Sequence, residues 1–129
     1  MEKRKPRILI IEDDEYSREA IEHLLNAEGC ETKSAANGVS GYRAARRFAP
    51  NIIVLDLNLP DIDGVEVTAR LKCSPELAHI PVVALTANAM HGDRERFLAA
   101  GCDGYIPKPI TKNELLTTIA NLLANKNGR

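Results

Sequence analysis

Carboxylates follow two strongly apolar runs in this sequence. Ile8–Ile11 is followed by Glu12 and Asp13, and Ile52–Leu55 is followed by Asp56. Short aliphatic runs rich in β-branched residues are typical of strands buried on both faces of a parallel sheet. A carboxylate at the end of such a strand faces solvent on a rigid mount, where it can act as a nucleophile toward phosphorus. Taken alone, Asp56 would be explained more simply as the cap of a following helix.

Two further polar residues end apolar runs later in the chain. Thr86 ends the run that begins at Pro81, and Lys108 follows Gly104–Pro107. The carboxyl ends of parallel strands meet at one edge of the sheet, so we expect these side chains to converge with the carboxylates. Carboxylates in one crevice repel one another unless a cation neutralises them. The sequence therefore predicts a Mg²⁺ site, since this ion prefers oxygen ligands, and the ligands are Glu12, Asp13, Asp56 and the backbone carbonyl of Asn58.

The predicted site is suited to phosphoryl transfer onto Asp56. Magnesium would bridge Asp56 to an incoming phosphoryl group, and Lys108 and Thr86 would contact the phosphoryl oxygens. Calcium is disfavoured because the ligands do not follow an EF-hand spacing. No GxGxxG or GxxxxGK[ST] motif follows the first apolar run, which argues against a nucleotide cradle. A true phosphohydrolase would need a second acid two residues after the nucleophile, where this chain has Asn58.

The composition excludes several broad functions. Of 129 residues, 44% are hydrophobic and 27% charged, and the formal net charge is -1. This balance gives no general attraction to nucleic acid or anionic membranes. Cys30, Cys73 and Cys102 are far apart and form no CxxC motif, so we expect free thiols. No run approaches the roughly 18 apolar residues of a membrane span. We therefore expect a cytoplasmic protein with no direct contact to nucleic acid or membrane.

Strand and helix patterns alternate along the chain. Strands are predicted at Arg7–Ile11, Thr32–Ala36, Ile52–Asp56, Pro81–Thr86 and Gly104–Pro107. Helical spacing centres on Ala20–Leu25, Tyr42–Phe48, Val65–Lys72, Met90–Ala100 and Leu115–Leu123. Such alternation implies right-handed βαβ crossovers and a parallel five-stranded sheet with helices on both faces. We expect a single domain over 1–129, with its core at about 7–123 and no output domain.

Five short motifs together resemble the receiver domain of bacterial two-component response regulators, over about residues 7–123. They are Ile10-Ile11-Glu12-Asp13-Asp14, Val54-Leu55-Asp56-Leu57-Asn58-Leu59-Pro60, Asp63-Gly64, Leu85-Thr86-Ala87 and Tyr105-Ile106-Pro107-Lys108-Pro109. The combination is very specific, although no single motif is. The resemblance implies a flavodoxin-like (βα)5 doubly wound α/β fold, with strand order 2-1-3-4-5.

The resemblance also implies a phosphorelay. Asp56 would take a phosphoryl group from a histidine kinase or a histidine phosphotransfer protein, while Glu12 and Asp13 organise Mg²⁺. The family more often has aspartate at the position of Glu12, so we expect Glu12 to reach the metal through water. No reaction is expected other than the chain's own phosphorylation and dephosphorylation.

A conformational switch is implied in the same way. Thr86 and Tyr105 resemble the family's switch pair, which on phosphorylation changes the surface formed by the helix at 90–100, the strand at 104–107 and the last helix. A downstream protein would bind this surface, and a phosphorylation-dependent homodimer could form through it. The family further suggests a cis peptide bond before Pro109.

Two related readings stay open at this point. The chain could be the receiver module of a hybrid histidine kinase, because residues 77–81 and 87–96 resemble such receivers as well as stand-alone regulators of cell-cycle type. It could also be a pseudo-receiver that acts as a scaffold without phosphorylation. The complete set of polar residues at the strand ends argues against the scaffold; the set is Glu12, Asp13, Asp56, Thr86 and Lys108.

Overall fold

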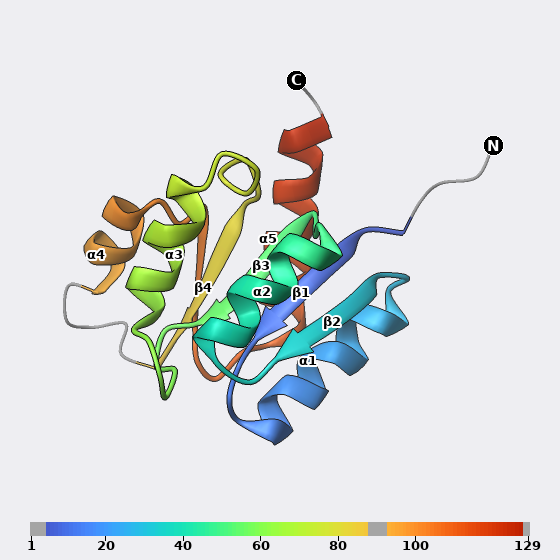
Figure 1. Ribbon diagram of the computed structural model, residues 1–129. Coiled ribbons are helices and arrows are strands. Elements are labelled where there is room, and N and C mark those ends of the chain that lie inside the picture. Colours follow the sequence, from blue (N-terminus) through green and yellow to red (C-terminus); the bar gives the residue numbers. More distant parts are fainter. Residues whose placement is uncertain (1–4, 88–92, 128–129) are drawn as a thin grey trace.

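Strands and helices alternate through the whole described chain, as the sequence predicts (Figure 1). The computed structural model describes residues 5–87 and 93–127. The strands are β1 (Arg7–Ile11), β2 (Glu31–Ala35), β3 (Ile52–Asp56), β4 (Val82–Thr86) and β5 (Gly104–Pro107). The helices are α1 (Glu15–Ala27), α2 (Gly38–Phe48), α3 (Gly64–Cys73), α4 (Asp93–Ala100) and α5 (Lys112–Asn127). The predicted start of the fourth helix, Met90, lies outside the described residues.

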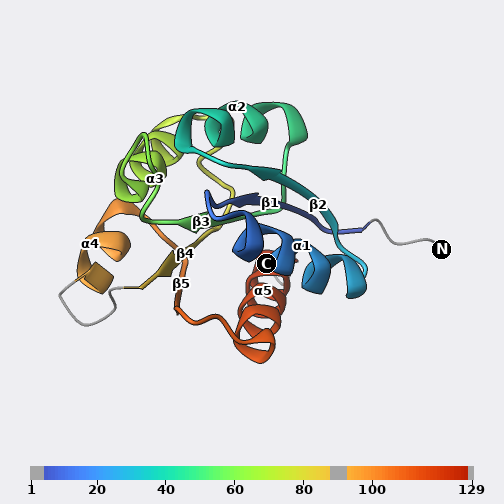
Figure 2. The ribbon, with the colours of Figure 1, turned by 90° about the horizontal axis from the view of Figure 1, so that it is seen from below.

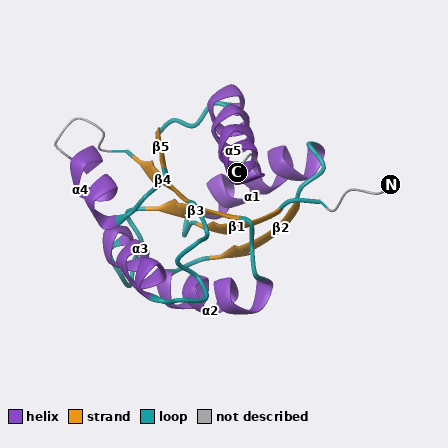
Figure 3. Cartoon of the chain, turned by 90° about the horizontal axis from the view of Figure 1, so that it is seen from above, coloured by secondary structure: helices purple, strands orange, loops and turns teal. Residues whose placement is uncertain are grey.

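The five strands form one parallel sheet of order β2-β1-β3-β4-β5, which confirms the predicted topology. Helices α1 and α5 cover one face, and α2, α3 and α4 cover the other (Figures 2 and 3). In register, Asp56 lies opposite Leu85, and Thr86 lies opposite Pro107. The strands therefore end nearly level with one another, which brings their following residues to one edge of the sheet.

The central strands β1 and β3 supply the core on both faces of the sheet. Leu55 and the residues of β1 and β3 whose side chains point to the same face of the sheet pack with α2, α3 and α4. Val54 and the residues of β1 and β3 whose side chains point to the other face pack with α1 and α5. Residues Ile52 to Leu55 are all fully buried, and each side chain stabilises the fold by roughly 1.5–3 kcal/mol. This burial on both faces holds Asp56 on a rigid support.

Aspartates are the N-cap residues of two helices, α1 and α3. Asp14 Oδ2 accepts a hydrogen bond from the Ser17 amide at 2.9 Å, so Asp14 caps α1. Asp63 Oδ1 accepts from the Val65 amide at 2.8 Å and caps α3 in the same way. Since Asp63 fills that position, the simpler explanation of Asp56 as a helix cap is wrong.

The cysteines and the helix lengths bear on the expectations drawn from composition. Cys30, Cys73 and Cys102 are all free thiols, as predicted. Within residues 5–87 and 93–127, none of the helices combines the length and the apolar character that crossing a bilayer requires.

Candidate functional site

Three carboxylates meet at the carboxyl edge of the sheet. Glu12 and Asp13 follow β1, Asp56 ends β3, and one oxygen from each lies within 4.8 Å of the others. Glu12 and Asp56 are buried, with relative exposures of 0% and 2%, so the expectation that a carboxylate at the end of β3 faces solvent is wrong; Asp13 is exposed. The structure thus brings together the carboxylates of the predicted metal site, with Asp13 on the solvent side.

Lys108 extends its ammonium group toward the buried pair of carboxylates. Its Nζ lies 3.3 Å from Glu12 Oε1 and 3.5 Å from Asp56 Oδ1. The backbone amide of Lys108 donates to the carbonyl of Thr86 at 2.7 Å, which fixes the end of β5 against β4. Burial works to lower the pKa of Lys108, but the charges of Asp56 and Glu12 outweigh it and raise that pKa. The side chain is therefore a permanent cation beside the acidic site.

The crowding of buried carboxylates raises the pKa of Glu12. Burial raises its pKa from 4.5 to about 7, and the hydrogen bond and negative charge of Asp56 act in the same direction. The Asp14 amide, which donates to Glu12 Oε2 at 3.2 Å, and the Lys108 ammonium offset only part of this. One ammonium group faces three carboxyl groups, so negative charge is in excess. A set of hard oxygen donors with excess charge fits a hard divalent cation such as Mg²⁺.

We expect the pKa of Glu12 to make the metal-free protein less stable as the pH rises. The folded-state pKa of about 7 exceeds the ordinary 4.5, so folding favours the protonated carboxyl. Its contribution is complete below pH 4.5 and is lost as the pH rises through 7. In EDTA, the unfolding free energy from urea denaturation should decline across this window by roughly 1–3 kcal/mol more in the wild type than in Glu12→Gln. Parallel curves for the two proteins would contradict this role of Glu12.

Backbone contacts fix the two loops that carry the carboxylates. Asp56 Oδ1 accepts from the Asn58 amide at 3.1 Å, which folds the loop after β3 back toward the site. Arg18 Nη1 donates to the carbonyl of Glu12 at 2.9 Å and to that of Asp13 at 3.4 Å. Arg18 thus fastens the loop after β1 to helix α1. It is a supporting residue that the sequence did not single out.

Asp61 is a second supporting residue that the sequence analysis missed. Its Oδ1 accepts from the Gly38 amide at 2.8 Å, and its Oδ2 accepts from the Val39 amide at 3.0 Å. These amides lower the pKa of Asp61. The two hydrogen bonds join the loop after Asp56 to the start of α2. The bonded residues are 22 and 23 positions apart, so no local pattern could have indicated the contact.

Thr86 and Tyr105, the predicted switch pair, lie on the neighbouring strands β4 and β5. Thr86 is buried at the end of β4, and Tyr105 is half-buried in β5. The Tyr105 ring lies 5.8 Å from the Phe97 ring of α4, measured between centroids. Tyr105 therefore links β5 to α4. The Lys108–Pro109 peptide bond that follows is cis, the isomer suggested by the resemblance.

The fold and this site define a class of protein. Residues 8–120 match the response regulator receiver domain family, and the chain belongs to that family. Its similarity to individual members extends over nearly their whole length. It is 42% identical to the polar-differentiation response regulator DivK of Brucella anthropi over 118 residues, which cover 92% of this chain and 96% of that protein. DivK of Brucella ovis is 41% identical over the same shares.

Solved receiver structures agree with this assignment. The receiver domain of the sensor histidine kinase PA1611 of Pseudomonas aeruginosa PAO1 is 32% identical and superimposes with a TM-score of 0.87, over 94% of this chain and 99% of that one. That structure has a magnesium ion coordinated in its active-site cleft. A CheY-like receiver domain protein of Methanospirillum hungatei JF-1 is 28% identical with a TM-score of 0.89, over 97% and 98% of the two chains. The chain is thus the receiver domain of a response regulator, a signalling switch rather than a classical enzyme.

Proposed function

We propose that Asp56 is the phosphoacceptor of this receiver domain. The carrying observation is its placement: a buried carboxylate at the end of β3, within 4.8 Å of two further carboxylates and 3.5 Å from the Lys108 ammonium. Family membership supports a histidine kinase or a histidine phosphotransfer protein as the phosphodonor.

The transfer would be a single displacement at phosphorus. An Asp56 oxygen attacks the phosphorus of a phosphohistidine, the new P–O bond forms as the P–N bond breaks, and the imidazole leaves with the electron pair. Lys108 and Thr86 hold the phosphoryl oxygens through an ammonium charge and a hydroxyl donor. Attack by water on the acyl phosphate later releases inorganic phosphate and restores the carboxylate, so the cycle turns over only the chain's own phosphate.

Mg²⁺ is the proposed cofactor of this site. The acidic cluster supports it, as does the magnesium ion in the PA1611 receiver domain. The proposed ligands are Glu12, through water, together with Asp13, Asp56 and the backbone carbonyl of Asn58. When bound, the ion would neutralise charge that accumulates between the carboxylates and the phosphoryl group.

We propose that phosphorylation is transmitted through Thr86 and Tyr105 to the surface formed by α4, β5 and α5. The packing of Tyr105 against Phe97 supports this route, because a rotation of the Tyr105 ring would alter its contact with Phe97 on α4. A new charge with its hydrogen bonds can bias such a two-state element. A downstream protein, or a second phosphorylated copy, would then bind this surface.

The chain is further proposed to act as a stand-alone cytoplasmic regulator with one domain over 1–129. The identity of 42% to Brucella anthropi DivK, against 32% to the receiver domain of the histidine kinase PA1611, supports a DivK-like regulator over a module of a hybrid kinase. The complete acidic site argues against a scaffold that does not use phosphate.

The proposal is tested by incubating the wild-type protein with acetyl phosphate, with and without Mg²⁺, and measuring intact mass. We expect a gain of one phosphoryl group that requires Mg²⁺.

Asp13→Asn should weaken Mg²⁺ binding by about tenfold or more, because an exposed ligand carboxylate is lost. Isothermal titration without phosphodonor measures that affinity separately. A wild-type protein that gains no mass, or an Asp13→Asn protein with unchanged affinity, would argue against the proposed site.

A further inference from the structure

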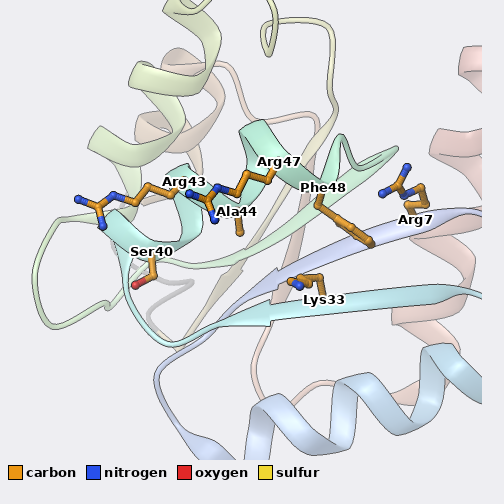
Figure 4. A pocket seen from close by; sticks show the side chains of 7 residues that line it. All are labelled: Arg7, Lys33, Ser40, Arg43, Ala44, Arg47 and Phe48. Atoms are coloured by element: carbon orange, nitrogen blue, oxygen red, sulfur yellow. The ribbon is translucent and has the colours of Figure 1, made fainter.

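A basic hollow lies between helix α2 and the edge strand β2, apart from the acidic site (Figure 4). Its volume is about 510 Å³, within the range of pockets that hold small molecules. Four cationic side chains from three elements line it, together with a serine hydroxyl and an aromatic ring: Arg7, Lys33, Arg43, Arg47, Ser40 and Phe48. Arg7 begins β1, whereas Glu12 follows the opposite end of that strand. None of the residues that line the hollow belongs to the acidic cluster.

The arginine at one end of the hollow is fixed in place. The Arg7 guanidinium carbon lies 4.5 Å above the Phe48 ring, in cation–π geometry. Within the described part of the chain, its buried Nε has no hydrogen-bond partner. Arg7 Nε forms a long ion pair with Glu31 Oε1 at 4.0 Å, which is beyond hydrogen-bond distance. The Phe48 ring therefore holds the Arg7 guanidinium at the hollow, with the Glu31 carboxylate 4.0 Å from its Nε.

The two cations that α2 contributes to the hollow, Arg43 and Arg47, have no carboxylate partner in the described part of the chain. Arg43 and Arg47 are four residues apart, which puts two like charges on one helix face and disfavours the helix. Among residues 5–87 and 93–127, neither forms an ion pair, and nor does Lys33 opposite them on β2. By contrast, Arg46 on the same helix pairs with Glu76 at 3.2 Å and lies outside the hollow. An anion bound between α2 and β2 would relieve this repulsion.

We propose that the hollow binds a small polyanion carrying at least two phosphate groups, such as a nucleoside polyphosphate. Guanidinium groups bind phosphate oxygens through paired hydrogen bonds, and Lys33 adds a point charge. Figure 4 shows Arg43 toward one end of the hollow and Arg7 toward the other, with Arg47 and Lys33 between them. A single phosphate would engage only one part of this series, whereas a chain of phosphates would engage several members at once.

Inorganic triphosphate is the probe for the first test. It is titrated into the full chain in EDTA at about 0.15 M salt, where weak surface attraction is screened, and amide NMR spectra are recorded. We expect shifts centred on β2 and α2. The double variant Arg43→Gln/Arg47→Gln should weaken the affinity by about tenfold or more, since two charge-assisted contacts are lost. The matched control Arg46→Gln removes one arginine from the same helix and should change the affinity by less than about twofold.

Further titrations distinguish the possible ligands. Stronger binding of ATP than of triphosphate would assign the site to nucleotides, and equal binding would assign it to the phosphate chain alone; both support the proposal. Stronger binding of an oligoglutamate peptide would overturn it in favour of a protein-binding surface. Absence of shifts, shifts centred on Asp56, or equal losses in Arg46→Gln and the double variant would also overturn it. Because no phosphodonor is present, these results do not depend on phosphorylation of Asp56.

Discussion

Replacing Asp56 with asparagine is expected to abolish phosphorylation of this protein. The amide has nearly the shape of the carboxylate but is a very poor nucleophile, so it cannot form the acyl phosphate. Asp56→Asn should gain no phosphoryl mass from acetyl phosphate and Mg²⁺ under conditions in which the wild type gains one. The expected loss of rate is at least about 10³-fold, which places it beyond detection in an intact-mass assay.

The fold of this variant should survive, which makes the result interpretable. Asp56 Oδ1 accepts from the Asn58 amide at 3.1 Å, and the amide oxygen of asparagine can accept the same bond. The substitution also removes one of the charges that raise the pKa of Glu12. It also removes the ion pair between Asp56 Oδ1 and Lys108 Nζ at 3.5 Å, so the two effects oppose each other and the unfolding free energy near neutral pH should stay within about 2 kcal/mol of the wild-type value. Continued labelling of a folded Asp56→Asn protein would assign the phosphoacceptor to another residue.

The position of the acidic site was predictable because parallel strands impose it. Once Ile8–Ile11 and Ile52–Leu55 are recognised as buried strands, Glu12 and Asp56 must lie at the same edge of the sheet. The structure places them there, with Lys108 between them. The strand order came instead from the resemblance to receiver domains, since alternation alone allows several orders.

Contacts that depend on spatial register between distant segments were not predictable. Asp61 reads as part of a turn in the sequence, yet it binds the first amides of α2. Arg18 reads as one charge on an amphipathic helix, yet it holds the loop after β1. The basic hollow was missed for the same reason: Arg7, Lys33 and Arg43 come from three segments. Each position has an ordinary surface explanation until the packing of α2 on the sheet is known.

The alanine substitution of Gly64 is expected to impair both stability and phosphorylation. Gly64 is the first residue of α3, and its amide donates to the carbonyl of Leu57 at 3.1 Å. A Cβ there would lie 2.6 Å from Leu57 Cα and 2.9 Å from the carbonyl oxygen of Asp56. Both atoms belong to the backbone, so the segment that carries Asp56 must move. We expect a loss of about 1–3 kcal/mol in unfolding free energy from overpacking, and up to about 10²-fold in phosphorylation rate from misplacement of the nucleophile.

Gly104→Ala provides the matched control, because the same methyl group is added at a position where the nearest atoms are side-chain methyl groups that need to move by only a few tenths of an ångström. Its Cβ would first meet Thr118 Cγ2 at 3.2 Å and Val83 Cγ2 at 3.4 Å, both of which are side-chain atoms. We expect a change of less than about 1 kcal/mol and a nearly normal phosphorylation rate. The rates are compared well below the unfolding transition of each variant, so a slow Gly64→Ala protein reports displaced geometry rather than unfolding. If the two variants phosphorylate equally fast, the close approach of Gly64 to Leu57 serves packing alone and does not position Asp56.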